Sequence, residues 1–183
     1  ELYTQLGDSP RAIELLIERL KQCRTHHDEP RYAENLNALG KIFAAHGNLE
    51  RGIENFKEAA KLFEKLGMKP QMADSFIHLG NTFYSAHEYD KALYYLFRSS
   101  HTMENIDDVN LKIRTLSSIA AVYTAQKKFE MALACLNEAL AISTRTDSVL
   151  LRAEVQKNLG ELYLELTKYD YAIDILRKAM FWA

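Results

Sequence analysis

A period of 40 residues runs along this 183-residue chain and constrains its fold more than any other feature. Five kinds of residue recur four times in the same order: a small residue, an aromatic, a second small residue, a large apolar residue and a third small residue. The columns are Gly40, Gly80, Ala120 and Gly160; Phe43, Phe83, Tyr123 and Tyr163; Gly52, Ala92, Ala132 and Ala172; Phe56, Leu96, Leu136 and Leu176; and Ala59, Ser99, Ala139 and Ala179. Such self-similarity predicts an array of stacked supersecondary units.

The apolar residues within one period are spaced as on a helix. They fall three or four positions apart from Tyr32 to His46, and again from Glu50 to Leu66, which is the spacing of one helical face. The dipeptide Gly47-Asn48 breaks the pattern between the two segments. Gly67 follows the second segment, where a left-handed C-cap is expected. The sequence therefore predicts two helices per repeat, joined by a short turn.

The small residues predict where the two helices of a repeat approach each other. A first helix can lie close to its second helix only where side chains are small, so we expect Gly40 to face the backbone near Gly52. By the same argument Gly80 should lie near Ala92. The aromatic column then fills the wedge between neighbouring repeats. Because no repeat can bury its apolar face alone, stability is expected to come from stacking.

These columns resemble the tetratricopeptide repeat. The segments NALGKIF, IHLGNTF, SSIAAVY and KNLGELY are similar to its first helix, and RGIENFKEA, KALYYLFRSS, MALACLNEAL and YAIDILRKAM to its second. The resemblance covers essentially the whole chain. It implies an all-α fold, a right-handed α-solenoid of stacked antiparallel helix pairs, in which the first helices line a concave groove that binds ligands.

The period differs from the 34 residues usual in that family, so both helices are expected to be longer than usual. Repeats of about 40 residues are similar to those of kinesin light chains, spindle-orientation scaffolds and bacterial peptide-sensing regulators. We interpret 1–183 as a single array, with a partial repeat at 1–29 and repeats at 30–69, 70–109, 110–149 and 150–183. Glu1-Leu2-Tyr3 aligns with Glu161-Leu162-Tyr163, and we expect the chain to be a fragment of a longer protein, because solenoids carry polar end caps.

The composition excludes several classes of function. The chain has 23 basic and 25 acidic residues, whereas nucleic-acid-binding domains usually carry a basic balance. No apolar run approaches the roughly 18 residues needed to span a bilayer, and no block of like charges favours a membrane surface. Cys23 and Cys135 lie far apart in the sequence and predict neither a disulfide nor a metal site, which favours a reducing, cytoplasmic location.

No catalytic constellation appears in the sequence. There is no glycine-rich phosphate loop and no HExxH, CxxC or GxSxG motif, and the histidines are scattered over the partial repeat and the first two full repeats. The run Cys23–His27 is the best metal candidate, but Cys23 occupies the same core column as Phe63 and Met103. We expect no catalytic residues, no metal and no cofactor, and therefore a protein that is not an enzyme.

The resemblance places a binding groove on the first-helix residues that do not face the core. Asn37 and Asn81 could hold a peptide backbone, because an asparagine side chain both donates and accepts hydrogen bonds. Arg114 could hold a carboxylate in bidentate fashion. The alternative for each is a solvated side chain or a hydrogen bond between helices. The residues expected to contact a partner are Asn37, Lys41, Ile77, Asn81, Tyr84, Arg114, Lys157 and Glu161.

We interpret the chain as a non-catalytic module that binds a peptide or protein segment in this groove, as a scaffold or as the sensory domain of a larger regulatory protein. The alternative is a structural module that self-associates through the ends of the array, where Phe181 and Trp182 lie, and leaves the groove empty. No nucleic-acid or membrane partner is expected.

Overall fold

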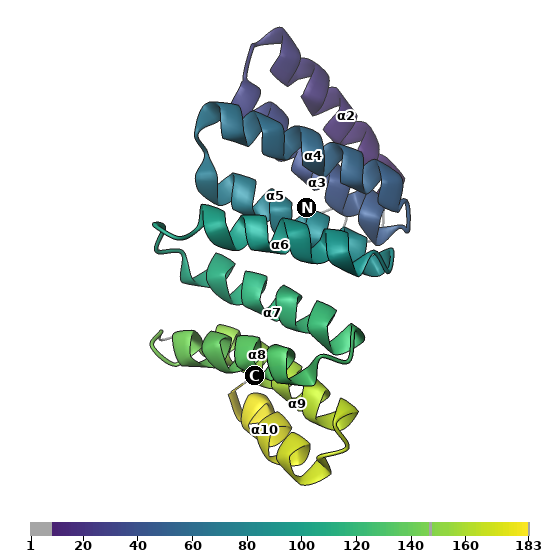
Figure 1. Ribbon diagram of the computed structural model, residues 1–183. Coiled ribbons are helices and arrows are strands. Elements are labelled where there is room, and N and C mark those ends of the chain that lie inside the picture. Colours follow the sequence, from purple (N-terminus) through teal and green to yellow (C-terminus); the bar gives the residue numbers. More distant parts are fainter. Residues whose placement is uncertain (1–8, 147, 183) are drawn as a thin grey trace. The chain divides into compact units, whose positions relative to one another are not determined.

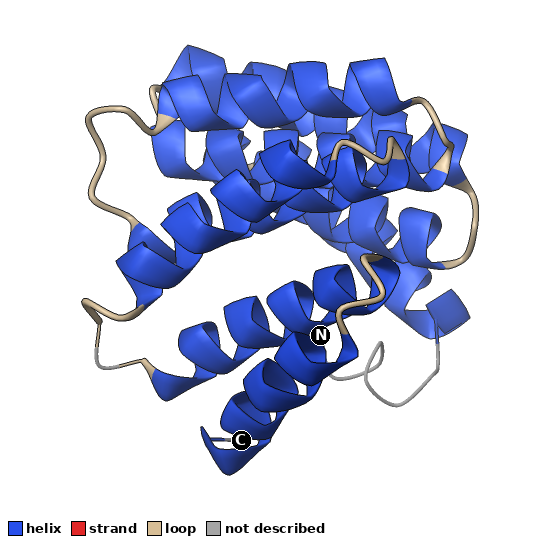
Figure 2. Ribbon diagram, turned by 60° about the horizontal axis from the view of Figure 1, so that its bottom comes forward, coloured by secondary structure: helices blue, strands red, loops and turns tan. Residues whose placement is uncertain are grey.

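The computed structural model describes residues 9–146 and 148–182. Within these residues the chain forms α-helices joined by turns and contains no strand (Figure 2). The predictions made for Glu1-Leu2-Tyr3, and for the side chains of Phe181 and Trp182, lie outside the described part of the chain.

The helices follow the 40-residue period (Figure 1). The first helices of the four repeats begin at residues 29, 69, 109 and 149, and they are α3 (Glu29–Ala45), α5 (Lys69–Ser85), α7 (Val109–Ala125) and α9 (Val149–Glu165). The second helices are α4 (Leu49–Leu66), α6 (Tyr89–Thr102), α8 (Phe129–Ser143) and α10 (Tyr169–Trp182), and α2 (Ser9–Thr25) precedes them all. The predicted all-α architecture of helix pairs is confirmed.

The chain divides into two compact parts between α6 and α7. The N-terminal part, Glu1–Glu104, contains α2–α6, and the C-terminal part, Asn105–Ala183, contains α7–α10. Within the N-terminal part each helix packs against the next one in the sequence, and the same holds within the C-terminal part. The 40-residue period continues through this division, so the interpretation of 1–183 as one array does not predict it.

Small residues mark the closest approach of the two helices of a repeat, as predicted. A β-carbon added to Gly52 would lie 3.3 Å from the backbone oxygen of Gly40. One added to Gly80 would lie 3.2 Å from the backbone oxygen of Ala92, and only 2.5 Å from Leu96 Cγ. The large apolar residue of the second helix therefore packs directly on the glycine of the first.

The aromatic column fills the space between neighbouring repeats in the N-terminal part. Phe83 on α5 is 4% exposed and stacks on Tyr95 of α6 with ring centroids 5.4 Å apart. The ammonium of Lys57, on α4 of the preceding repeat, lies 5.9 Å from the centre of the Phe83 ring. Phe83 thus contacts both repeats, as the sequence predicts. In the C-terminal part Tyr163 of the same column stacks on Tyr171, with centroids 5.6 Å apart.

The turn inside each repeat contains one residue in the left-handed backbone conformation. Gly47 has a φ of 78°. At the equivalent positions His87, Lys127 and Thr167 have φ values of 59°, 58° and 57°. This conformation suits glycine but costs other L-residues roughly 1–2 kcal/mol. Gly67, at the end of α4, has a φ of 69°, which confirms the left-handed cap predicted there.

Replacing Thr167 by glycine should stabilise the protein, because a β-branched residue is strained in this conformation. The free energy gained by relieving the backbone strain exceeds the free energy lost because glycine makes the unfolded chain more flexible. We therefore expect the free energy of unfolding to rise by about 0.5–1 kcal/mol. Chemical denaturation measures it. The matched control, Gly47→Ala at the equivalent turn, should lower stability, and a lower stability for Thr167→Gly would contradict the strain argument.

Gly80→Ala should fail to stabilise the protein although alanine favours helix. The gain in helix propensity is about 1 kcal/mol, whereas overpacking against Leu96 and the Ala92 backbone costs about 1–3 kcal/mol. Thermal unfolding should therefore show an unchanged or lower melting temperature, with the larger loss if Leu96 cannot shift. Ala120→Gly is the control in the same column, because there the native residue is already alanine and its loss should cost about 1 kcal/mol. A clear rise in melting temperature for Gly80→Ala would contradict the close approach.

Candidate functional site

A pocket of about 330 Å³ lies in the N-terminal part between α3, α4 and α5. Its apolar lining comes from α3 and α4 and its polar lining mainly from α5. The lining residues are Lys41, Ala44, Ala45, Leu49, Phe56, His78, Asn81, Thr82 and Ser85. A cavity of this volume, lined by both apolar and polar side chains, is within the size range of ligand sites.

A charged cluster links the two first helices beside this pocket. The Lys41 ammonium on α3 lies 3.7 Å from Asp74 Oδ2 on α5, and His78 Nε2 lies 3.2 Å from the same oxygen. The His78 ring stacks on Phe56 of α4, with centroids 5.1 Å apart and 18° between the planes. Through Asp74 the cluster joins Lys41 and His78, two of the residues that line the pocket.

The polar wall along α5 retains hydrogen-bonding capacity. The Thr82 hydroxyl donates to the backbone oxygen of His78 at 2.7 Å, and the Ser85 hydroxyl donates to that of Asn81 at 3.1 Å. The Asn81 side chain is exposed. Within the described residues its amide makes no hydrogen bond, so it can donate to and accept from a bound segment.

The structure brings two of the predicted groove residues together. Lys41 and Asn81, which occupy the same column of successive repeats, both line the pocket. Tyr84, one turn beyond Asn81, is 36% exposed and lies beside the pocket lining rather than in it, with its ring 6.1 Å from that of Tyr89. Contact of these three residues with a partner stays a prediction.

Asn37 and Ile77 do not face a groove, which corrects the sequence interpretation. Asn37 is 7% exposed and Ile77 is 1% exposed. The Asn37 side-chain oxygen accepts a hydrogen bond of 3.1 Å from the buried Ser75 hydroxyl on α5. Asn37 therefore points at the neighbouring first helix, and its hydrogen bond to Ser75 links α3 to α5. For Asn37 the alternative of an interhelical hydrogen bond is the one observed.

The other three predicted residues lie in the C-terminal part. Arg114 on α7 is half-buried. Lys157 and Glu161 are exposed on α9, where the Lys157 ammonium lies 3.6 Å from Glu161 Oε1. Each of these two charges therefore already has an opposite charge one helical turn away. Their contact with a partner also stays a prediction.

Asp74 and His78 are functional candidates that are not among the residues predicted from the sequence to contact a partner. They are four residues apart on α5, a spacing that places two side chains on one helical face. This (i, i+4) carboxylate–imidazole pair was the available signal. Asp74 contacts Lys41 of α3 and His78 contacts Phe56 of α4. These contacts depend on the packing of three helices, so no local sequence pattern predicts them.

The cysteines are placed as ordinary partly buried side chains. Cys23 Sγ accepts a hydrogen bond from the Asn35 amide at 3.6 Å. Burial raises the pKa of the Cys135 thiol, and the Glu138 carboxylate raises it further, so the thiol is a weak nucleophile at neutral pH. Among the described residues, no group of three or more histidine, cysteine, aspartate or glutamate side chains is arranged to hold a metal ion.

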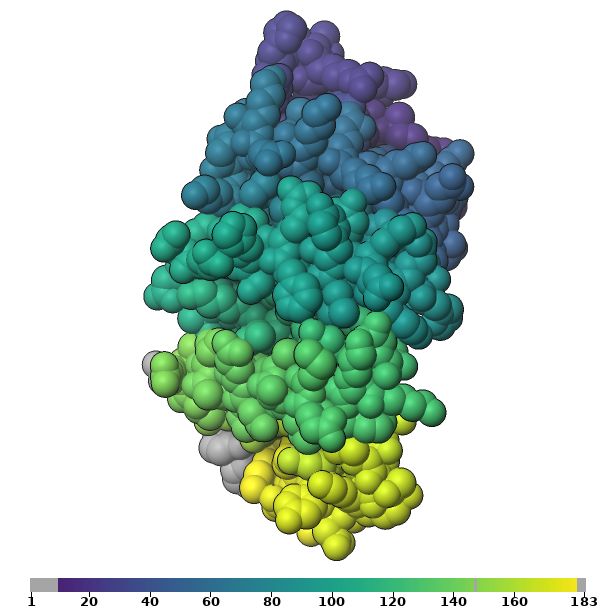
Figure 3. Space-filling model, viewed as in Figure 1, coloured from purple at the N-terminus to yellow at the C-terminus, as the bar shows by residue number. Residues whose placement is uncertain are grey.

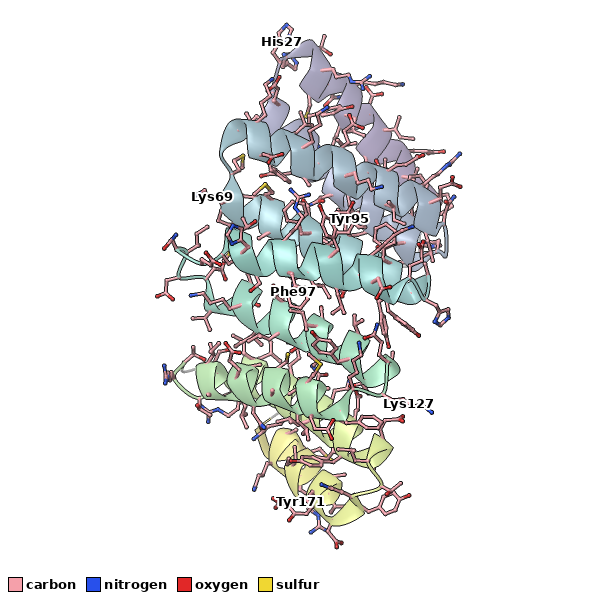
Figure 4. The ribbon with its side chains drawn as sticks, in the orientation of Figure 1. His27, Lys69, Tyr95, Phe97, Lys127 and Tyr171 are labelled. Atoms are coloured by element: carbon pink, nitrogen blue, oxygen red, sulfur yellow. The ribbon has the colours of Figure 1, made fainter. Side chains whose placement is uncertain are left out.

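A second feature of the surface lies on α6, outside the pocket. Tyr94 and Phe97 are 57% and 49% exposed, on a helix that reaches the surface in the view of Figures 3 and 4. We call these two residues the α6 aromatic pair. As to membranes, none of the described helices combines the length and the apolar character required to cross one.

The sequence profile of the tetratricopeptide repeat matches residues 111–180, in the C-terminal part. The helix pairs and the 40-residue columns extend the same unit over the rest of the described chain. Residues 111–180 therefore match the tetratricopeptide repeat family, and the described helix pairs share the fold of solved repeat proteins. This fold is typical of protein-interaction modules and is generally a non-catalytic scaffold. No curated protein sequence matches the chain.

Solved structures share the fold of this repeat array. BtubC (BKLC) from P. vanneervenii is 17% identical with a TM-score of 0.83, over 99% of this chain and 75% of its own. Aspartyl phosphate phosphatase F from Bacillus subtilis is 13% identical with a TM-score of 0.85, over 98% of this chain and 49% of its own. A STAND protein with a tetratricopeptide repeat sensor from Pyrococcus horikoshii is 23% identical with a TM-score of 0.77, over 95% and 28%. These likenesses confirm the predicted α-solenoid class.

The stabilities of the variants Asn37→Ala and Lys41→Ala should distinguish a residue that packs between helices from one that lies at the surface. Loss of Asn37 removes a buried hydrogen bond to Ser75, and we expect a loss of about 1–3 kcal/mol of stability. Loss of Lys41 removes an exposed ion pair and should change stability by less than about 1 kcal/mol. Urea denaturation of the two variants measures this difference. Equal stability of both variants would contradict the placement of Asn37 in the packing between α3 and α5.

Proposed function

We propose that the protein is a non-catalytic module that binds an extended segment of a partner protein across α3 and α5. The observation that carries the proposal is the pocket in which Lys41 and Asn81, from two successive first helices, stand together. Its lining combines apolar side chains with hydrogen-bond donors and acceptors, which is what an extended peptide needs for its side chains and its backbone.

The packing of the site supports binding without rearrangement. Asn37 and Ser75 tie α3 to α5 below the surface, with a hydrogen bond of 3.1 Å. Asp74 links Lys41 to His78 above it. A wall held in place by such contacts loses little conformational freedom on binding, and a preorganised surface binds more tightly for the same contact area.

Tyr84 extends the proposed surface along α5, and Arg114, Lys157 and Glu161 are proposed as contacts in the C-terminal part. The repeats at 30–69, 70–109, 110–149 and 150–183 then act as one binding array in the cytoplasm. The STAND protein is described as having a tetratricopeptide repeat sensor, and another likeness is a Rap protein complexed with competence and sporulation factor. Both support a sensory role within a larger regulator, beside a role as scaffold.

Self-association is the second candidate. On α10, Ile173 and Met180 are 48% and 78% exposed, and such apolar side chains favour contact between copies. Sedimentation at several protein concentrations distinguishes the candidates. A constant monomer mass supports the segment-binding function, and a mass that rises with concentration and falls in Met180→Lys supports assembly.

The test of the segment-binding function is selection from a displayed library of random extended peptides. The wild type should enrich a family of sequences, and the variant Lys41→Ala with Asn81→Ala should bind them at least about tenfold more weakly, since each lost hydrogen bond contributes roughly 1 kcal/mol. Lys61→Ala, an exposed change on α4, is the matched control and should bind like the wild type.

Two results would contradict the proposed surface. One is equal enrichment on the wild type and on the double variant, which would place the binding site elsewhere. The other is the absence of enriched sequences on a wild type that is correctly folded by circular dichroism, which would remove the support for peptide binding. Comparable helicity and melting of all three proteins is the condition for comparing them.

A further inference from the structure

We propose that the outer face of α6 binds an α-helix of a folded partner protein, a helix that carries a carboxylate beside an apolar side chain. We call Tyr94, Phe97, Arg98 and His101 the α6 surface. It shares no residue with the pocket lining, so the inference goes beyond the proposed function. Three features carry it: the spacing of these residues, the charge of Arg98, and the contrast with the other second helices.

The spacing of the α6 surface is that of a helix-packing face. Its members stand at positions i, i+3, i+4 and i+7, which lie on one side of a helix, whereas the buried Ala92, Leu96 and Ser99 lie on another. Tyr94 is 57% exposed and Phe97 is 49% exposed. Because the backbone groups inside a helix bond to each other, this face offers side chains only. It therefore suits a second helix, which packs through rows of side chains, better than an extended peptide.

The half-buried guanidinium of Arg98 lacks a carboxylate. Its Cζ lies 4.3 Å from the centre of the Phe76 ring and 5.9 Å from the centre of the Tyr94 ring. With the described residues it forms neither an ion pair nor a hydrogen bond. A guanidinium has five N–H donors in a planar fork that matches a carboxylate. Arg98 is thus held beside the exposed Tyr94 ring with its donors available to an acidic side chain of the partner.

The other charges on α6 favour a single carboxylate over a polyanion. Lys91 forms an ion pair with Glu88, and His101 Nδ1 lies 2.9 Å from Glu104 Oε1. Asp90 is exposed on the same helix. Nucleic acids and anionic bilayers bind to clusters of uncompensated cations, which this arrangement does not provide. One acidic side chain flanked by apolar ones is the better match.

The other second helices do not carry this combination. The α4 positions equivalent to Tyr94, Phe97 and Arg98 are charged and exposed: Glu54, Lys57 and Glu58. At the position of Arg98, three other helices carry a glutamate: Glu18, Glu58 and Glu138. The packing of the array therefore requires neither aromatic residues nor an arginine at these positions. Tyrosine and arginine are, by contrast, enriched among the residues that dominate binding energy at protein interfaces.

The aromatic pair is held in place from below. The Tyr94 ring meets that of Tyr95 edge-on, with centroids 5.1 Å apart and 80° between the planes. Tyr95 in turn stacks on the buried Phe83. A side chain that is already fixed loses little conformational freedom on binding, which favours its use as an anchor.

The test is selection on the full chain from a displayed library of a small three-helix domain, randomised on one helical face. Enriched domains should carry aspartate or glutamate beside an apolar residue. The variant Tyr94→Glu with Arg98→Glu should bind them at least about tenfold more weakly, because it removes an aromatic anchor and reverses the charge that meets the carboxylate. It copies Glu54 and Glu58 of α4, so wild-type helicity is expected and circular dichroism checks it. Glu54→Ala is the matched control and should bind like the wild type.

Exchange of charges separates direct contact from a packing role of Arg98. Replacing the acidic residue of an enriched domain by lysine should weaken binding to the wild type at least about tenfold, and Arg98→Glu should restore it. Arg98→Gln, which keeps a long side chain without the charge, should weaken binding of the original domain. Lack of restoration in a folded Arg98→Glu protein would overturn the proposal. So would a selection in which no enriched domain depends on Tyr94 and Arg98.

Two other occupants are outcomes that would overturn the choice of a partner helix. One is a second copy of the chain, indicated by a sedimenting mass that rises with concentration in the wild type and not in the double variant of α6. The other is a membrane surface, indicated by co-sedimentation with phosphatidylcholine–phosphatidylserine vesicles that the same variant abolishes. Neither result depends on Lys41 or Asn81, so the proposed function can stand or fail independently.

Discussion

The fold of this array depends on the close contact between the two helices of each repeat. Gly40 and Gly80 leave no side chain at the crossing, and a β-carbon on Gly80 would lie 2.5 Å from Leu96 Cγ. Packing of the large residue on the glycine fixes the depth at which the two helices meet. It also sets the outward position of the aromatic column, so that Phe83 can contact the second helices of two repeats.

The candidate site follows from the same packing. The first helices α3 and α5 contact each other through Asn37 and Ser75, and the polar residues one face away, Lys41 and Asn81, come to lie at the pocket. The pocket is open because positions 44 and 45 hold alanine. The pocket thus coincides with a departure from the repeat pattern in the size of side chains, since the position equivalent to Ala44 in the next repeat holds Tyr84.

Sequence periodicity predicts the helices, the left-handed cap at Gly67 and the glycine crossings, because each depends on residues close in sequence or in one column. It does not predict the left-handed turns at His87 and Thr167, because neither residue type favours that conformation. The periodicity also misplaces Asn37 and Ile77. A small rotation of the helix about its axis decides whether these side chains are exposed to solvent or packed against a neighbouring helix. The contact of His78 with Phe56 requires three helices in place and is invisible in any one of them.

The central claim is that a partner segment lies across α3 and α5 rather than on the outer helices. Site-specific photo-crosslinking tests it most directly: p-benzoylphenylalanine replaces Ser85, at the pocket, or Phe97, in the α6 aromatic pair, and each protein is illuminated with a peptide that the wild type binds. The account predicts an adduct from position 85 and none from position 97. An adduct from position 97 alone would contradict it.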